Sequence, residues 1–195
     1  MIEFDYPEGA TPLTADEVEG LVPTHITTRT QIDRWEQDNI NDALAWLEGH
    51  KPKAILTESF MKLLHKKMFC NVWKWAGQLR QREKNIGVPW YNISVELRTL
   101  CDDANYWIEN RTFPADEIAA RFHHRLVSIH LFSNGNGRHS RLVADLLLEN
   151  VLGKPPFTWG RANLVRSGED RKKYIESLVA ADKGEYQQLL EFVRS

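Results

Sequence analysis

The sequence predicts an all-α fold in a single domain. Several runs place apolar residues at the three- and four-residue spacing of one helix face, as in Ile32, Trp35, Ile40, Ala43, Leu44 and Leu47. The chain has 195 residues, 42% of them apolar, which is enough for one ordinary core. Its formal net charge of -2 gives no general reason to expect nucleic acid or an anionic membrane as a partner.

Threonines are expected to begin the helices of the N-terminal part. Thr14-Ala-Asp-Glu17 has the capping-box pattern and predicts a short helix that ends near Gly20. Thr30 is expected to cap a longer helix ending near Gly49, and Thr57 a third helix.

Residues 78–92 interrupt this helical pattern. Asn85, Gly87 and Pro89 punctuate the segment, and its few apolar residues lie among polar ones. We expect either a short hairpin or an extended loop. Beyond it, helices are expected to begin at Ser94, near Pro114 and near Arg138, and to cover 169–182 and 185–193.

The chain shows no signal for secretion or membrane insertion. No apolar run approaches the ~20 residues of a transmembrane helix, and the acidic start lacks the basic flank of a secretory signal. Cys70 and Cys101 are too few and too isolated for a disulfide scaffold. We therefore expect a cytoplasmic protein with no membrane partner.

Residues 128–141, Ser-Ile-His-Leu-Phe-Ser-Asn-Gly-Asn-Gly-Arg-His-Ser-Arg, are the stretch richest in chemistry. They predict a helix, a tight loop and a second helix, whose first amides would be unpaired and would favour an anion. Gly135 and Gly137 leave room for a phosphate beside these amides. Arg138 and Arg141, three residues apart, lie on one helix face and suit a polyphosphate.

His130 lies at the other lip of this loop, where it can act as general base on a group that attacks the phosphate. The alternative is an ordinary turn with solvated arginines. Two arginines in a first helical turn oppose the helix dipole, however, and this favours a bound anion.

Residues 130–141 also resemble the signature of the Fic (Fic/Doc) family, His-Pro-Phe-x-(Asp/Glu)-Gly-Asn-Gly-Arg-x-x-Arg. The resemblance extends through 64–69, 73–77 and 174–178, and the opening residues 9–13 and 23–29 resemble the bacterial branch named mobile mystery protein B. It implies a Fic-like helical core at 56–195 with a small β-hairpin flap. Residues 1–55 would be an arm and helices, packed on the same domain.

The resemblance implies transfer of AMP from ATP to a Tyr, Thr or Ser hydroxyl of a target protein, with His130 as the catalytic base. The target would dock along the flap at 78–92. Nucleotide-binding residues implied by the family pattern are Gly135, Asn136, Gly137, Arg138 and Arg141 at the phosphates, and Tyr174 and Asp182 near the purine. Two alternatives stay open: other phosphorus chemistry on the same loop, such as phosphotransfer or removal of AMP, and a non-catalytic nucleotide-binding regulatory module.

Two positions depart from the family signature. Leu131 replaces its proline, and Asn134 replaces the acidic residue that in the family coordinates Mg²⁺. An amide oxygen can bind a hard cation but brings no charge, so we expect a weaker magnesium site and leave the activity itself open.

The N-terminal helix carries a partial regulatory motif. Glu19-Gly20 resembles the end of the family's inhibitory motif, Ser/Thr-x-x-x-Glu-(Gly/Asn), although Ala15 stands at the Ser/Thr position. Glu19 would then pair with Arg141 and restrain activity; the alternative is a helix that only packs. The narrower branch occurs beside a helix-turn-helix protein, as in a toxin–antitoxin pair, and so implies such a partner.

Overall fold

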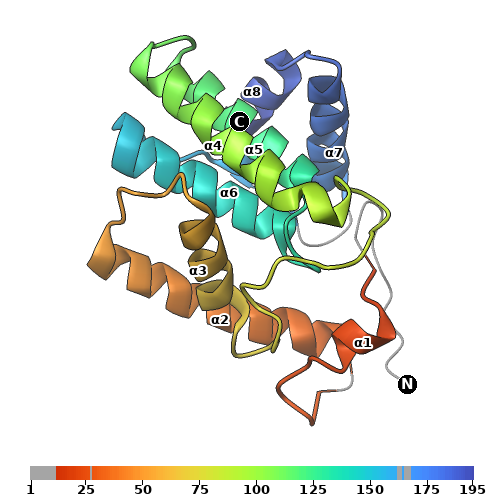
Figure 1. Cartoon of the computed structure of the whole chain (residues 1–195). Coiled ribbons are helices and arrows are strands. Elements are labelled where there is room, and N and C mark those ends of the chain that lie inside the picture. The colour runs from red at the N-terminus through yellow and green to blue at the C-terminus, as the bar shows by residue number, and fades with distance from the viewer. Residues whose placement is uncertain (1–11, 27, 162–163, 165–167) are drawn as a thin grey trace.

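The protein is described by a computed structural model, in which residues 12–26, 28–161, 164 and 168–195 are placed. Figure 1 shows the helices along the chain. They are α1 (Ala15–Val18), α2 (Arg29–His50), α3 (Glu58–Phe69), α4 (Ile93–Glu109), α5 (Ala115–Ile129), α6 (Asn136–Leu147), α7 (Glu169–Asp182) and α8 (Gln187–Arg194). Short 3-10 turns at Trp90–Asn92 and Trp159–Arg161 and a π-turn at Leu148–Leu152 complete the described part. The predicted all-α class is confirmed.

Helix α5 lies at the centre of this arrangement. It packs against α4, α6 and α8, while α2 and α3 pair with each other and reach α6 through α3 (Figure 1). Phe122, Leu126 and Ile129 of α5 are buried, which follows from their three- and four-residue spacing. The core therefore fixes the C-terminal end of α5 and the start of α6, where the signature loop lies.

The helix N-termini follow the cap chemistry of the sequence, with two corrections. The capping box at Thr14 and the cap at Thr57 are confirmed. The cap of α2 is Thr28 and not Thr30, because Gln31 completes a capping box with Thr28. Helix α4 begins at Ile93, so that Ser94 lies inside it, because the preceding 3-10 turn leads directly into the helix.

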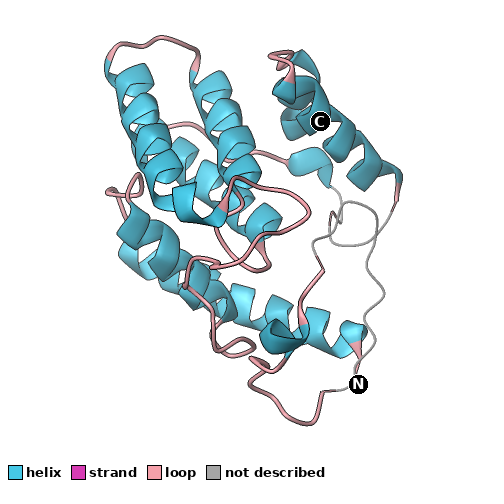
Figure 2. Ribbon diagram, turned by 45° about the vertical axis from the view of Figure 1, so that its right-hand side comes forward, coloured by secondary structure: helices cyan, strands magenta, loops and turns pink. Residues whose placement is uncertain are grey.

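The predicted β-hairpin at residues 78–92 is wrong. The segment is an irregular loop, and Figure 2 shows no strand in the described part of the chain. Its backbone bonds to another part of the protein: Arg80 N–H donates to the Leu131 carbonyl at 2.9 Å, and Val88 N–H to the Ile129 carbonyl at 3.3 Å. Both of these backbone bonds run to residues at or just beyond the end of α5, and they do not form a hairpin ladder.

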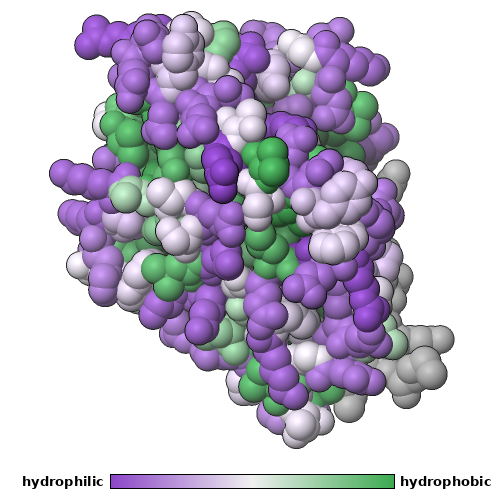
Figure 3. All heavy atoms as spheres, in the orientation of Figure 1, coloured by the Kyte–Doolittle hydropathy of each residue, from purple (hydrophilic) through white to green (hydrophobic). Residues whose placement is uncertain are grey.

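The face shown in Figure 3 mixes hydrophilic residues with scattered hydrophobic ones. Among the residues described, no helix is both long enough and apolar enough to cross a membrane.

Candidate active site

The signature loop connects α5 and α6 through two residues in left-handed conformation. His130 ends α5 at φ 59° and ψ 65°, and Gly135 precedes α6 at φ 79°. A Cβ on Gly135 would lie 2.7 Å from the ring of Phe69, so only glycine fits there. The Asn136 side chain closes the loop, since its Oδ1 accepts from Phe132 N–H at 2.9 Å and its Nδ2 donates to the Phe132 carbonyl at 2.7 Å.

The first turn of α6 presents backbone donors. The first amide of this helix with an i→i−4 partner is His139, which donates to the Gly135 carbonyl at 2.9 Å. The amides of Asn136, Gly137 and Arg138 come before it and so have no partner within the helix. Gly135 N–H donates to Oδ1 of Asn134 at 2.6 Å. Three successive amides at a helix N-terminus are suited to phosphate oxygens.

His65 of α3 supports the signature loop through a hydrogen bond to its backbone. Its Nδ1 accepts from Gly77 N–H at 2.9 Å, so Nε2 carries the proton and donates to the Asn134 carbonyl at 3.0 Å. The ring stacks on Phe132 at 3.7 Å between centroids. Burial lowers the pKa of His65 well below 6.5, which keeps the ring neutral. A neutral ring in a single tautomer thus ties the Asn134 carbonyl of the signature loop to Gly77.

His130, at the start of the signature loop, is 4% exposed. Burial lowers its pKa to about 4, and the positive charges of Arg80 and Lys84 act in the same direction. The ring also forms a hydrogen bond with the backbone of Val127 that favours its N–H. A ring that donates one N–H to a carbonyl and is neutral at pH 7 keeps its other nitrogen as a base.

Arg80 fixes the backbone of His130. This arginine is 3% exposed, and its Nε donates to the His130 carbonyl at 2.6 Å. It also donates to the carbonyls of Ile129 (3.4 Å), Arg82 (2.9 Å) and Val88. A cation at the C-terminus of α5 satisfies carbonyls that the helix leaves unpaired and matches the sign of its dipole.

The loop at 78–92 passes directly over His130 at a glycine. Gly87 has φ 112°, and a Cβ there would lie 2.7 Å from Cβ of His130. Lys84 in the same loop is tied to α1, because its Nζ donates to Oε2 of Glu17 at 2.5 Å. Glu17 also forms a hydrogen bond with Ser133 of the signature loop. Helix α1 is thereby attached to both loops beside His130.

Each of the two signature arginines, Arg138 and Arg141, contacts another side chain that holds it in place. Nη1 of Arg138 donates to Oε2 of Glu36 at 2.7 Å, and its guanidinium lies over the ring of Phe69 at 4.8 Å. Arg141 lies 5.6 Å from the ring centre of Tyr174 and bonds to its hydroxyl. Both side chains are therefore held near the first turn of α6.

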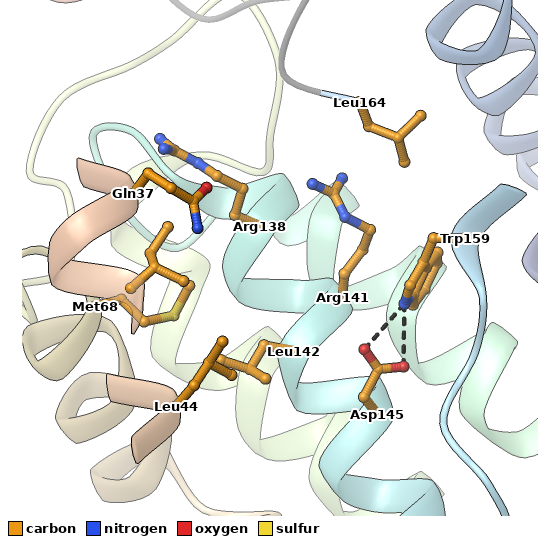
Figure 4. Close-up of a pocket in the computed structure, with 10 residues that line it drawn as sticks. Gln37, Leu44, Met68, Arg138, Arg141, Leu142, Asp145, Trp159 and Leu164 are labelled. Carbon is orange, nitrogen blue, oxygen red and sulfur yellow. Dashed lines mark hydrogen bonds between the residues drawn. The ribbon is translucent and has the colours of Figure 1, made fainter. Parts of the chain in front are cut away.

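A cavity of about 380 Å³ lies along the outer face of α6, between α2 and the segment around Trp159. Figure 4 shows Arg138 and Arg141 at one side of it, with Leu44 and Leu142 below them. Asp145 accepts two bonds from the Trp159 indole N–H at 3.0 Å, and burial raises its pKa to about 6. His130 is not among the residues that line this cavity.

Of the three remaining predicted site residues, Tyr174 contacts Arg141, whereas Asp182 and Glu19 have other surroundings. Tyr174 is buried, with its hydroxyl 3.0 Å from Nε2 of His123, and Asp182 is exposed and accepts from Nε2 of His124 at 2.8 Å. Glu19 is exposed at the end of α1, and the structure does not bring it to Arg141. Their roles at the purine and as a brake stay predictions.

Sequence reasoning missed Glu36, Arg80 and the loop contact of His65. A signal was present for two of them. Glu36 interrupts the apolar stripe between Ile32 and Ile40, and His65 lies beside Leu64 on the buried face of α3. A polar residue on a buried stripe requires a partner. Arg80 gave no such signal, because its loop has no periodicity.

Comparisons with known proteins agree with this architecture. The model of the Fic/DOC family matches residues 55–148. A relative named protein adenylyltransferase Fic, from Aedes aegypti, is 32% identical over 121 residues, which are 60% of this chain and 23% of that protein. The chain thus spans about a quarter of that relative's length.

Solved structures share the fold. The N-terminal Fic domain of Bep8 from Bartonella sp. 1-1C superposes with a TM-score of 0.71 at 17% identity, over 89% of each chain. BepC from Bartonella tribocorum, with bound AMPPNP, superposes with a TM-score of 0.69 at 17% identity, over 93% of this chain and 97% of that one. The family model and the shared fold together identify residues 55–148 as a Fic/DOC family domain.

Proposed function

We propose that this protein transfers AMP from ATP to a hydroxyl group of a protein. One observation carries the proposal: a buried, neutral His130 stands at one end of a loop whose other end offers three helix-start amides and two arginines. The name of the Aedes aegypti relative and the AMPPNP bound to BepC support the same chemistry.

The reaction divides between the two ends of the loop. The hydroxyl oxygen of the target attacks the α-phosphorus of ATP, the bond from that phosphorus to the bridging oxygen breaks, and pyrophosphate leaves. The free nitrogen of His130 takes the hydroxyl proton as the new bond forms. The amides of Asn136, Gly137 and Arg138 hold the oxygens on which negative charge increases.

The arginines act on the phosphates beyond the α-phosphorus. Arg138 and Arg141 are three residues apart on the first turns of α6, and each is fixed by a partner. Two fixed guanidinium groups can hold the pyrophosphate portion in line with the attacking oxygen. The reacting groups then lose less translational and rotational freedom on reaching the transition state. We assign the Asn136 side chain to loop closure, because both its polar atoms contact Phe132.

A target hydroxyl would arrive along residues 78–92, which border His130. This loop offers exposed residues, among them Trp90 and Tyr91. Binding of the target along this loop, a helix-turn-helix partner and restraint by Glu19 are further parts of the proposal.

Magnesium fits the chain's own residues poorly. Mg²⁺ in nucleotide sites is usually held by one or two carboxylates together with phosphates. Here Asn134 supplies an amide oxygen that already accepts from Gly135 N–H, and the described residues contain no cluster of three potential metal-ligating side chains. We therefore assign Mg²⁺ to the MgATP substrate and give it no protein carboxylate.

Asn134→Asp is expected to lower the Mg²⁺ concentration for half-maximal transfer by roughly 3- to 10-fold, because a carboxylate adds charge at the same position. A magnesium titration of the transfer rate measures this. The carboxylate can still accept from Gly135 N–H, so the loop should keep its shape. Equal or lower activity in the variant across the titration would argue against a metal role for this side chain.

The pH dependence of transfer is expected to reflect the lowered pKa of His130. The base must be neutral, so the rate falls as pH decreases through the folded-state pKa, which is about 4 and not 6.5. Values of kcat/KM should stay level from pH 8 to about 5, checked within the range where circular dichroism is constant. An inflection near pH 6.5 would contradict a buried base.

Labelled ATP separates AMP transfer from the alternatives. With ATP labelled at the α-phosphate, the protein target or the enzyme itself should gain label, whereas ATP labelled at the γ-phosphate should give none. Label from the γ-phosphate alone would identify phosphotransfer. Binding of nucleotide without transfer of either label would identify a regulatory module.

A further inference from the structure

Glu36 is a buried acid to which the proposed reaction assigns no part. It lies on α2, is 1% exposed, and uses both carboxylate oxygens. Oε1 accepts from the indole N–H of Trp73 at 2.6 Å, and Oε2 accepts from Nη1 of Arg138 at 2.7 Å. Arg138 is itself only 15% exposed in its side chain. The pair therefore joins the middle of α2 to the first turn of α6.

Stability alone gives a poor account of this pair. Desolvation of two charges commonly cancels their attraction, and apolar residues of similar size often serve a core equally well. The pair does control geometry. Phe69 lies under the guanidinium plane at 4.8 Å, and Glu36 fixes its rotation within that plane. A flexible arginine is thus held in one orientation by two contacts.

Glu36 is held too firmly to move in and out of the nucleotide site as an inhibitor. Trp73, which holds Oε1, is 1% exposed. One turn further along α2, Asn39 donates to the Lys67 carbonyl at 2.9 Å and accepts from Asn71 N–H at 2.8 Å. These bonds attach α2 to the end of α3, so Glu36 cannot leave Arg138 unless the core moves.

We infer that Glu36 is a positioning residue, which orients Arg138 toward the phosphates beyond the α-phosphorus of the nucleotide. This rests on the proposed function for its consequence in catalysis. The carboxylate also offsets part of the charge of Arg138. Loss of the Glu36 charge should therefore lower kcat, because Arg138 is no longer oriented. The affinity for the nucleotide should stay equal or increase, because no attraction to the phosphates is removed.

Glu36→Gln tests this, because glutamine keeps the volume and can still accept from Trp73 but cannot pair with a cation. We expect kcat to fall roughly 10- to 100-fold, as for a misplaced group in a site, with the KM for ATP equal or lower. Glu48→Gln is the matched control: it makes the same change at an exposed position of α2 and should leave both constants unchanged. A rise in kcat would overturn the proposal and show that Glu36 blocks the site.

A second measurement does not depend on transfer. In ¹⁵N-edited spectra without nucleotide, the Nη protons of Arg138, assigned by their loss in Arg138→Lys, should give separate signals in the wild type. They should merge in Glu36→Gln as the guanidinium rotates freely, and stay separate in Glu48→Gln. Identical Arg138 signals in wild type and Glu36→Gln would overturn the inference. If the wild type transfers no AMP, the proposed function fails while these spectra still decide the role of Glu36.

Discussion

His130→Ala is expected to lower the rate of AMP transfer by roughly 10²- to 10⁴-fold, the range for loss of a general base. The reason is local. His130 is buried, its lowered pKa of about 4 keeps the ring neutral at pH 7, and it ends α5 at one end of the signature loop, with α6 beginning at the other. The phosphate-binding amides and arginines belong to α6 and do not depend on the imidazole. Titration with AMPPNP should therefore give a dissociation constant within about threefold of the wild type.

A histidine outside the loop provides the control. His50 is exposed at the end of α2 and contacts only the chain near it, through the Trp46 carbonyl at 2.7 Å. His50→Ala should transfer AMP at the wild-type rate. Single-turnover rates of the three proteins measure the effect directly. Transfer by His130→Ala at a rate similar to that of His50→Ala would remove His130 from the mechanism.

Arg80→Met should destabilise the protein by about 3–5 kcal/mol in free energy of unfolding, because a buried hydrogen-bond network is broken and several carbonyls lose their donor. Arg80 donates to carbonyls at the end of α5 and in the loop at 78–92, two segments that few other bonds connect. The neutral side chain also removes a positive charge beside His130. The pH limb of transfer in this variant should therefore move upward from about 4.

Arg82→Met is the matched control for this change. Arg82 lies two residues away, and its ion pair with Asp16 is exposed on both sides, with side-chain exposures of 61% and 63%. Such a surface pair contributes about 0–1 kcal/mol. Urea unfolding of both variants gives the comparison. Equal midpoints for Arg80→Met and Arg82→Met would show that Arg80 does not hold the loop.

The sequence predicted the helices well because helix formation is local. Thr14 and Thr57 supply caps to residues three positions away, and apolar spacing identifies the buried face of each helix. The site was predictable where the chemistry is contiguous, as in residues 130–141. Both parts depend on neighbours within a few turns.

The features that were missed depend on contacts between distant residues. Glu36 meets Arg138 across 102 positions, and Arg80 meets His130 across 50. The pattern of residues 78–92 left a hairpin and an extended loop open, and the family resemblance implied a hairpin, but two of the segment's backbone donors bond to carbonyls at the end of α5. A local pattern cannot identify an acceptor that folding brings from elsewhere in the chain.

The most direct test of the account is the intact mass of the purified protein after incubation with ATP and magnesium, since self-modification requires no known target. Wild type, Glu19→Gly, and Glu19→Gly combined with His130→Ala are compared. The account predicts a gain of one AMP that is larger in Glu19→Gly than in the wild type and absent from the double variant. A gain that persists without His130, or no gain in any variant despite AMPPNP binding, would contradict it.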